Sequence, residues 1–248
     1  MKKIFLFFFI VLSFFVIACQ KDESLQSKQD NLTPSNSQIS KPQKVSKKIT
    51  KQTKPFAKAQ WVIGKVSVSQ DGIHWTALKR NDKIYPLQWI KTEEKSRIKV
   101  VFWKNSSFSL SPNSLIQVKH FKEEKKGENQ AEILVGQGKL ISNIQRLNPK
   151  KGFYRIQGPA MVAGVRGTSF EFSSQKGKDT LIVQKGSVAA KRNVKNAPSA
   201  LITKDKGTQA AMEENQKLMK NKKSLTLEVV PAKKLRSGFV FFKSDYDD

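Results

Sequence analysis

The stretch Arg97-Ile-Lys-Val-Val-Phe-Trp-Lys-Asn-Ser-Ser-Phe-Ser-Leu110 decides the fold class of this chain. Apolar side chains stand at every second position from Ile98 to Phe102, and the alternation resumes at Phe108 after a turn-like Asn-Ser-Ser segment. A period of two residues is typical of a β-strand with one buried face. The stretch therefore predicts a β-hairpin.

The same pattern continues on both sides of this hairpin. Alternating or apolar runs are separated by turn-forming segments such as Gln70-Asp71-Gly72 and Gly136-Gln137-Gly138. Such regular spacing predicts an all-β body of short stacked strands, solenoid-like or sandwich-like. The further expected strands lie at 61–68, 73–79, 114–118, 131–135, 139–144, 153–157, 168–172 and 180–190.

Three segments set a glycine two residues before an apolar position: Gly64-Lys65-Val66, Gly138-Lys139-Leu140 and Gly186-Ser187-Val188. Glycine tolerates the backbone angles of a sharp corner, so this echo favours corners between stacked strands. The spacing of the three segments is uneven, and punctuation of ordinary hairpins is the alternative.

Two segments flank the expected β domain at 59–192. Residues 19–58 are mostly Lys, Gln, Ser, Thr, Asn and Pro with isolated aliphatic residues, which predicts a disordered tether. Residues 193–248 form a C-terminal extension, and its expected elements are a helix within 209–223 and strands at 225–230 and 239–242 that close the body.

Residues 1–18 have the parts of an export signal. Lys2 and Lys3 precede an apolar run from Ile4 to Ala18. As a helix this run covers about 22 Å, short of the ~30 Å hydrocarbon core of a bilayer. The run therefore predicts a signal peptide rather than a permanent span.

The export signal ends in Val16-Ile17-Ala18-Cys19, which resembles the lipobox of bacterial lipoproteins. The resemblance implies that residues 1–18 are removed and that lipid on Cys19 attaches the protein to a membrane. An ordinary signal peptide that contains a cysteine is the alternative. Cys19 is the only cysteine, so no disulfide forms within the chain. We expect an extracytoplasmic, lipid-anchored protein of the cell envelope. Gln20 after the cysteine favours the outer over the inner membrane, by analogy with lipoprotein sorting.

Residues 158–172, Gly-Pro-Ala-Met-Val-Ala-Gly-Val-Arg-Gly-Thr-Ser-Phe-Glu-Phe, carry the most specific pattern. They resemble the signature of the FecR-domain family, in which a Pro-Ala stretch leads into Val-Arg-Gly-Thr and an alternating strand. The resemblance extends over roughly 61–190 and implies a β-rich periplasmic domain. The signature residues, for which we expect a structural role, are Gly164, Val165, Arg166, Gly167, Thr168 and Phe170.

The chain departs from the family outside this domain. The best-known members join the domain to a transmembrane helix and to a cytoplasmic segment that controls a sigma factor, and the domain receives a signal from an iron–siderophore receptor. Here the lipid anchor stands in place of both segments, so we expect the domain without direct control of a sigma factor. The resemblance then implies a non-enzymatic binding or sensory module that engages another envelope protein or a ligand.

Arg166 has two interpretations. Its five N–H donors can bind backbone carbonyls and pin the turn, which is the role that we favour. The alternative is bidentate binding of an acidic ligand or partner. We expect Gly158, Gly164 and Gly167 where the backbone needs a positive φ or a close approach.

The net charge is +26, with lysine and arginine far in excess of acidic residues. One explanation is a surface of solvated lysines. The other is attraction to headgroups, polysaccharide or acidic proteins, which gives a second functional hypothesis: a structural or adhesive lipoprotein that binds anionic surfaces. The expected compartment argues against nucleic acid as a partner.

Catalytic machinery is absent from the motifs of the sequence. His74 and His120 are the only histidines, and we expect neither to have an acidic neighbour suited to a triad. No Gly-x-Ser-x-Gly elbow and no phosphate-binding loop occur. We therefore expect no enzymatic activity, no cofactor and no metal site.

Overall fold

The computed structural model describes residues 54–103, 105–124, 128–148, 150–221 and 223–236. The export signal, Cys19, the tether up to residue 53 and the strand expected at 239–242 lie outside the described residues. The first strand begins at Ala57, and Phe56 before it belongs to the core with 3% of its surface exposed. The β body therefore starts before the expected boundary at residue 59. No helix in the described ranges is long and apolar enough to cross a membrane.

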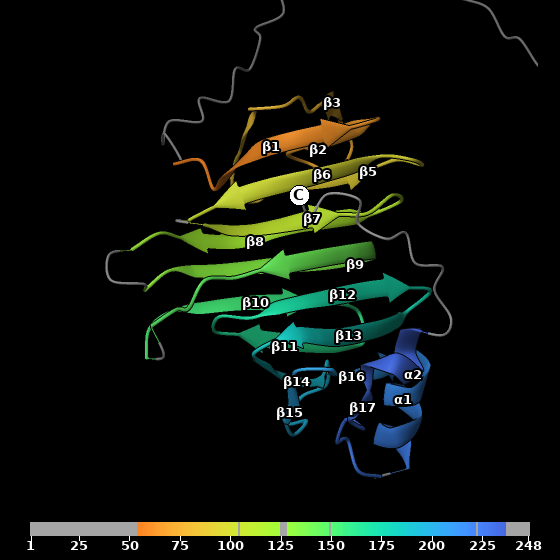
Figure 1. The fold of residues 1–248 in the computed structure, drawn as a ribbon. Helices are drawn as coiled ribbons and strands as arrows, with labels where there is room; N and C mark the ends of the chain where they lie inside the picture. Colours follow the sequence, from red (N-terminus) through yellow and green to blue (C-terminus); the bar gives the residue numbers. More distant parts are fainter. Residues whose placement is uncertain (1–53, 104, 125–127, 149, 222, 237–248) are drawn as a thin grey trace, which may run out of the picture. The chain divides into compact units, whose positions relative to one another are not determined.

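Strands dominate the described residues, and two short helices follow them near the carboxyl end (Figure 1). In chain order the elements are β1 (Ala57–Ile63), β2 (Val66–Ser69), β3 (Thr76–Ala77), β4 (Lys83–Ile84), β5 (Trp89–Thr92), β6 (Arg97–Phe102), β7 (Ser106–Leu110), β8 (Leu115–Lys122), β9 (Gln130–Asn143), β10 (Phe153–Gln157), β11 (Met161–Val165), β12 (Ser169–Gln175), β13 (Lys178–Lys185), β14 (Ser187–Arg192), β15 (Ala200–Thr203), β16 (Lys206–Ala211), α1 (Met212–Lys220), β17 (Val230–Pro231) and α2 (Ala232–Arg236).

Hydrogen bonds join these strands into one sheet that passes from one layer to another at β9. Layer A has the order β4-β1-β6-β7-β9-β12-β13-β16-β17. Layer B has the order β3-β2-β5-β8-β9-β10-β11-β14-β15. All neighbouring strands in these two orders are antiparallel except β9 and β10. The predicted all-β class of short stacked strands is confirmed.

Strand β9 links the two layers. Its amino-terminal half pairs with β8 and β10 in layer B, and its carboxyl-terminal half pairs with β7 and β12 in layer A. The buried positions change from odd numbers, such as Ile133 and Val135, to even numbers, such as Leu140 and Ser142. This change keeps the inward side chains in the core on both sides of the crossing. The sequence predicted two strands separated by a turn, and the observed element is one continuous strand.

The crossing in β9 requires a glycine. Gly138 has φ +93°, and a Cβ there would lie 2.4 Å from the Cα of Ser114. The other two glycines of the echo stand at equivalent places, since Gly64 connects β1 of layer A to β2 of layer B and Gly186 connects β13 of layer A to β14 of layer B. The corner interpretation of the echo is therefore confirmed.

One apolar cluster fills the space between the layers. The hairpin that decided the fold class supplies the centre, with Ile98 opposite Leu110 and Val100 opposite Phe108 in the β6–β7 register. Each of these four side chains has at most 1% of its surface exposed. An aromatic group adjoins them, in which the ring centroids of Phe102 and Tyr154 are 5.7 Å apart. The predicted hairpin and its inward face are confirmed.

Two expected strands are shorter than predicted, because side chains form hydrogen bonds with backbone groups in these stretches. In the stretch 73–79 only Thr76–Ala77 is a strand. The reason is that Asp71 Oδ1 accepts the backbone N–H groups of Ile73 and His74, which holds this segment in a loop. In the stretch 225–230 only Val230 belongs to a strand, while the carbonyl of Glu228 accepts a hydrogen bond from the Thr208 hydroxyl at 2.6 Å.

Other differences come from strands that the sequence did not reveal. Strands β5, β11, β15 and β16 were not expected, and β15 and β16 extend the two layers beyond residue 192. The expected helix within 209–223 is present as α1 but begins only at Met212, because residues 207–211 pair with β13. The C-terminal extension is thus partly a continuation of both layers.

Candidate functional site

The signature turn, residues 158–161 between β10 and β11, is held from the opposite layer. Asp179 of β13 lies in layer A, and its Oδ2 accepts the backbone N–H groups of Ala160 and Met161, both at 2.8 Å. Gly158 is required by this approach, because a Cβ there would lie 2.2 Å from the same Oδ2. The Pro-Ala part of the signature therefore encodes a bond between the layers.

Asp179 is completely buried, which is unusual for a carboxylate. Burial raises the pKa of Asp179 to about 6, and the hydrogen bonds from Ala160 and Met161 offset only part of this effect. No sequence pattern pointed to Asp179. The available signal was an acidic residue shortly before the apolar run Leu181-Ile182-Val183.

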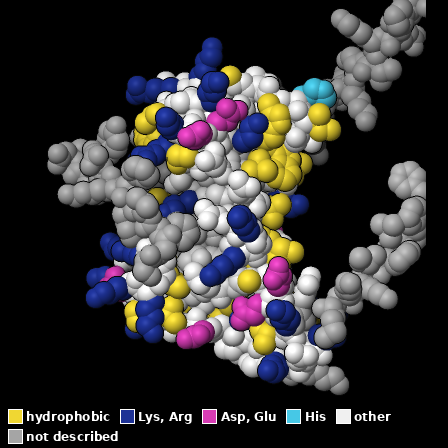
Figure 2. Space-filling model, turned by 90° about the vertical axis from the view of Figure 1, so that its right-hand side faces the viewer, with side chains coloured by type: hydrophobic (Ala, Val, Ile, Leu, Met, Phe, Trp, Pro, Cys, Tyr) yellow, Lys and Arg dark blue, Asp and Glu magenta, His cyan; other side chains and the backbone are white. Residues whose placement is uncertain are grey.

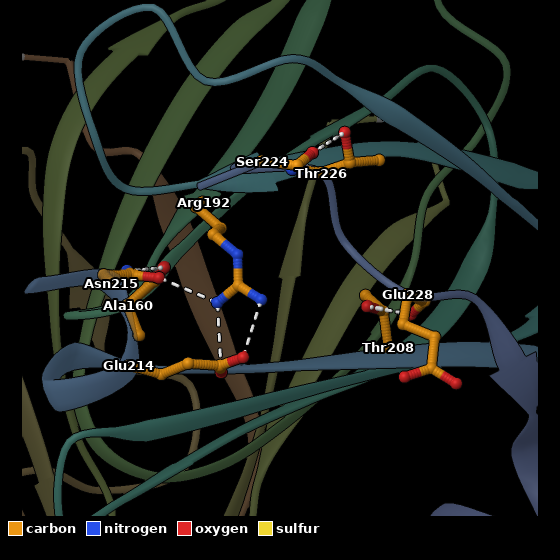
Figure 3. A network of polar contacts seen from close by, with 8 residues as sticks. All are labelled: Ala160, Arg192, Thr208, Glu214, Asn215, Ser224, Thr226 and Glu228. Atoms are coloured by element: carbon orange, nitrogen blue, oxygen red, sulfur yellow. Dashed lines mark hydrogen bonds and ion pairs between the residues drawn. The ribbon is translucent and has the colours of Figure 1, made fainter. Parts of the chain in front are cut away.

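A second group of polar contacts attaches α1 to the same turn (Figure 3). Asn215 donates to the carbonyl of Ala160 at 2.9 Å, and it accepts from the guanidinium of Arg192 at 2.9 Å. Arg192 also binds both carboxylate oxygens of Glu214, at 3.0 and 3.1 Å. Arg192 is 5% exposed and comes from the inner face of β14. The helix of the C-terminal extension is thereby bound to the signature turn.

Half of the predicted signature residues have buried side chains. Val165, Thr168 and Phe170 are buried, and the Thr168 hydroxyl donates to the carbonyl of Ser187 at 2.8 Å. Gly167 has a φ of +127°, a backbone conformation that favours glycine, as we expected. Gly164 differs from expectation, because a Cβ there would meet only the Ala189 carbonyl at an ordinary 3.7 Å.

Arg166 does not make the contacts that we expected. Its side chain is exposed, and within the described residues its guanidinium makes no hydrogen bond or ion pair. Arg166 takes part in a hydrogen bond only through its backbone, because its carbonyl accepts from the N–H of Leu147 at 3.2 Å. Pinning of this turn by the guanidinium is therefore corrected, because the turn between β11 and β12 is held by the N–H groups of Ile144 and Leu147, which donate to the carbonyls of Thr168 and Arg166.

A groove with a volume of about 1110 Å³ crosses the outer face of layer A. One outward residue from each of six neighbouring strands stands in direct register along it. We call these residues the central row. From β1 to β13 the central row is Trp61, Lys99, Ser109, Ile141, Glu171 and Ile182.

The groove combines apolar and basic side chains. Ile63 and Ile141 are 43% and 38% exposed, which leaves apolar surface open on this face. Arg97, Lys99 and Lys176 add positive charge, whereas Glu171 is neutralised by Lys139 at 2.9 Å. Small serines of β7 lower the floor at the centre. Such a surface suits an apolar or amphipathic segment that carries negative charge.

Helix α2 forms one end of the groove through Leu235 and Arg236. A Cβ on Gly207 of β16 would lie 2.5 Å from Leu235 Cδ1 and 3.3 Å from Ile182 Cγ1, so Gly207 lets the helix pack against this end. No sequence pattern indicated the groove. Most of its residues are the outward-facing positions of five alternating strands and of β13. That these positions share one face is evident only from the register of the strands.

His74 has an acidic neighbour, contrary to expectation. Its Nδ1 is 2.6 Å from Asp71 Oδ2 in an exposed loop, and this hydrogen bond is the largest of the effects that lower the pKa of Asp71. Asp71 Oδ1 is taken by backbone N–H groups of the same loop. In the described part of the chain no three His, Cys, Asp or Glu side chains gather into a group that could hold a metal ion.

Comparison with known proteins finds a family similarity in the central part of the β body. Residues 88–189 match the family described as FecR protein. This match agrees with the resemblance over residues 88–189, which contain β5 to β13 and the start of β14. No curated protein matches the chain.

Two crystal structures of a candidate anti-sigma factor from Parabacteroides distasonis ATCC 8503 are similar to this fold. They superpose with TM-scores of 0.41 and 0.42 at 11% and 10% sequence identity. Each comparison covers 57% of this chain and 57% of the other chain, so this chain spans little more than half the length of those structures.

Proposed function

We propose that this protein is a lipid-anchored, non-enzymatic FecR-domain module of the cell envelope that binds another envelope protein. The central row of the groove carries the proposal, since it joins open apolar surface at Ile141 to positive charge at Lys99 on a rigid sheet. Rigid strands hold such side chains at fixed spacing, which favours a specific partner. Lipid on Cys19 would keep the domain at a membrane, and the family match supports an envelope role.

A second candidate is a structural or adhesive lipoprotein that binds acidic polysaccharide or a host surface. The net charge of +26 supports it. Figure 2 shows lysine and arginine side chains spread over one face of the molecule, with acidic side chains fewer between them. Charge of this kind attracts anionic surfaces without a shaped site, and the attraction weakens as salt is added.

A crosslinked pull-down from intact cells separates the two functions. The wild-type chain is compared with Cys19→Ala, and each sample is washed at low and at high salt. One partner that survives high salt and is lost with Cys19→Ala supports the lipid-anchored binding module. Scattered acidic material that is lost at high salt supports the adhesive function instead.

The groove is tested in the same assay by replacing an apolar residue. Ile141→Lys should lower the yield of the partner at least about fivefold. The matched control is Leu201→Lys, because Leu201 is 63% exposed on β15 of layer B, away from the groove. Equal yields from the two variants would exclude the groove as the binding surface.

A further inference from the structure

The described chain ends at Arg236, which itself lines one end of the groove. Twelve residues follow, Ser237 to Asp248, in the sequence Ser-Gly-Phe-Val-Phe-Phe-Lys-Ser-Asp-Tyr-Asp-Asp. We call them the C-terminal segment. We propose that the C-terminal segment binds in the groove of its own chain and covers the central row.

The length of the C-terminal segment fits the groove. The central row crosses six strands, and at about 4.8 Å between neighbouring strands its five spacings cover about 24 Å. Twelve extended residues reach about 40 Å. The segment starts beside β13 at Arg236, so it is long enough to reach Trp61 on β1 at the far end.

The residue types of the segment are complementary to those of the groove, which has apolar and basic side chains at both ends. Phe239 to Phe242 come first, and the groove offers Leu235 at the nearest end and Ile141 at its centre. The aspartates at 245, 247 and 248 come last, and the far part of the groove carries Arg97 and Lys99. The floor between the two parts is lowered by Ser109, which leaves room for aromatic rings.

Intramolecular binding also suits the energetics of the segment. The attachment at Arg236 keeps the segment at a high effective concentration near the groove, so that modest contacts suffice to hold it. Burial of several phenylalanine side chains favours association, since about 25 cal/mol is gained for each Å² of apolar surface removed from water.

This inference needs only the groove and the segment, and it goes beyond the proposed function. One consequence rests on the proposed function. If the partner of that function also binds in the groove, the segment regulates access of the partner to the groove. The partner would have to displace the segment, and removal of the segment would raise the affinity for the partner.

Binding in trans tests the proposal with purified protein. The probe is a fluorescein-labelled peptide with the sequence of residues 237–248, and its anisotropy is followed as protein is added. A chain that ends at Arg236 should bind the peptide saturably, and the full chain should bind it at least about tenfold more weakly because its own segment occupies the groove. Equal binding to both chains, or equal binding of a scrambled peptide, would overturn the proposal.

A matched pair of charge reversals locates the site. Lys99 on β6 and Lys191 on β14 are both half-buried lysines at outward strand positions, one in the groove and one on layer B. In the shortened chain Lys99→Glu should weaken peptide binding at least about tenfold, and Lys191→Glu should leave it unchanged. Equal effects of the two variants would show binding by general charge and would contradict the groove.

Disulfide trapping in the full chain keeps the test independent of the shortened protein. Cys19→Ser removes the native thiol, and Phe241→Cys is paired with Ser109→Cys in the groove or with Gln117→Cys on the outer face of β8. Mild oxidation should close the Ser109 pair and leave the Gln117 pair open, as measured by thiol titration and intact mass. Closure of both pairs or of neither contradicts the proposal. No partner is present in these assays, so their outcome is separate from that of the pull-down.

Discussion

The signature turn and the groove show opposite relations between sequence pattern and use. The turn at 158–161 opens the most specific sequence pattern in the chain, residues 158–172, yet its polar groups bind Asp179 and Asn215 of the same body. The groove has no motif, yet it presents apolar and basic side chains to solvent. In this domain the family signature describes how the layers are joined, and the surface available to a partner lies on strand positions that the signature does not mark.

The largest effect is expected at the bond between the layers. Asp179→Ala leaves two buried backbone N–H groups without their acceptor, and each unsatisfied donor costs roughly 1–3 kcal/mol. The free energy of unfolding should fall by about 4 kcal/mol, as measured by urea denaturation. Asp205→Asn in the exposed turn before β16 is the control, because asparagine tolerates the φ of +60° at this position, and it should change the free energy of unfolding by less than about 0.5 kcal/mol. A similar small change at Asp179 would show that the turn holds without this bond.

The pH dependence of stability sharpens the same comparison. The pKa of Asp179 is about 6 in the folded protein against an ordinary 3.8, so the folded state binds the proton more tightly than the unfolded state. Stability from this group is therefore present below about pH 4 and is lost as the pH rises through about 6. The total loss is about 3 kcal/mol. Asp179→Asn should remove this decline from denaturation curves measured between pH 4 and 7, and an unchanged slope would contradict the assignment.

Attachment of α1 to the turn should have an intermediate effect. Asn215→Ala removes the donor to the Ala160 carbonyl and one acceptor of the buried Arg192. The expected loss is about 2 kcal/mol of unfolding free energy, since a buried polar group is left unpaired. Lys217→Ala on the exposed side of the same helix serves as the control. If both variants behave alike, the C-terminal extension is not held through Asn215.

The smallest effect is expected at the most recognisable signature residue. Arg166 is exposed and makes no side-chain hydrogen bond within the described residues, so Arg166→Ala should change the unfolding free energy by less than about 0.5 kcal/mol. Thr168→Val is the contrast, because it removes a bond to the Ser187 carbonyl and should cost about 1 kcal/mol. Thermal unfolding of both variants checks the order. A larger loss at Arg166 would restore its structural role.

Local patterns predicted much of the fold because strands report their buried face through a period of two. The β6–β7 hairpin and β10 were predicted within a residue of their bounds. Strand β11 was missed because its small residues Ala163 and Gly164 carry no apolar alternation, and its pairing with β14 comes from distant residues. The sequence predicts a turn where β9 crosses between the layers, because two nearby glycines occur both in turns and in strands that cross. Only the pairing of β9 with β8 before the crossing and with β7 after it distinguishes the two cases.

The site was less predictable for the same reason. Asp179 and Ala160 are far apart in the sequence, and their contact depends on which strands face each other across the core. The central row depends on the register of six strands, which no single segment encodes. Arg166 stood out by its place in a motif, although the motif is explained by backbone geometry and by its neighbours Val165 and Thr168.

The most direct test of this account compares Lys99→Glu with Arg166→Ala in the crosslinked pull-down, in chains with and without the C-terminal segment. We predict that Lys99→Glu lowers the yield of the salt-resistant partner at least about tenfold in both chain lengths, while Arg166→Ala retains it. Loss of the partner with Arg166→Ala and full retention with Lys99→Glu would place recognition on the signature and contradict the assignment of the groove.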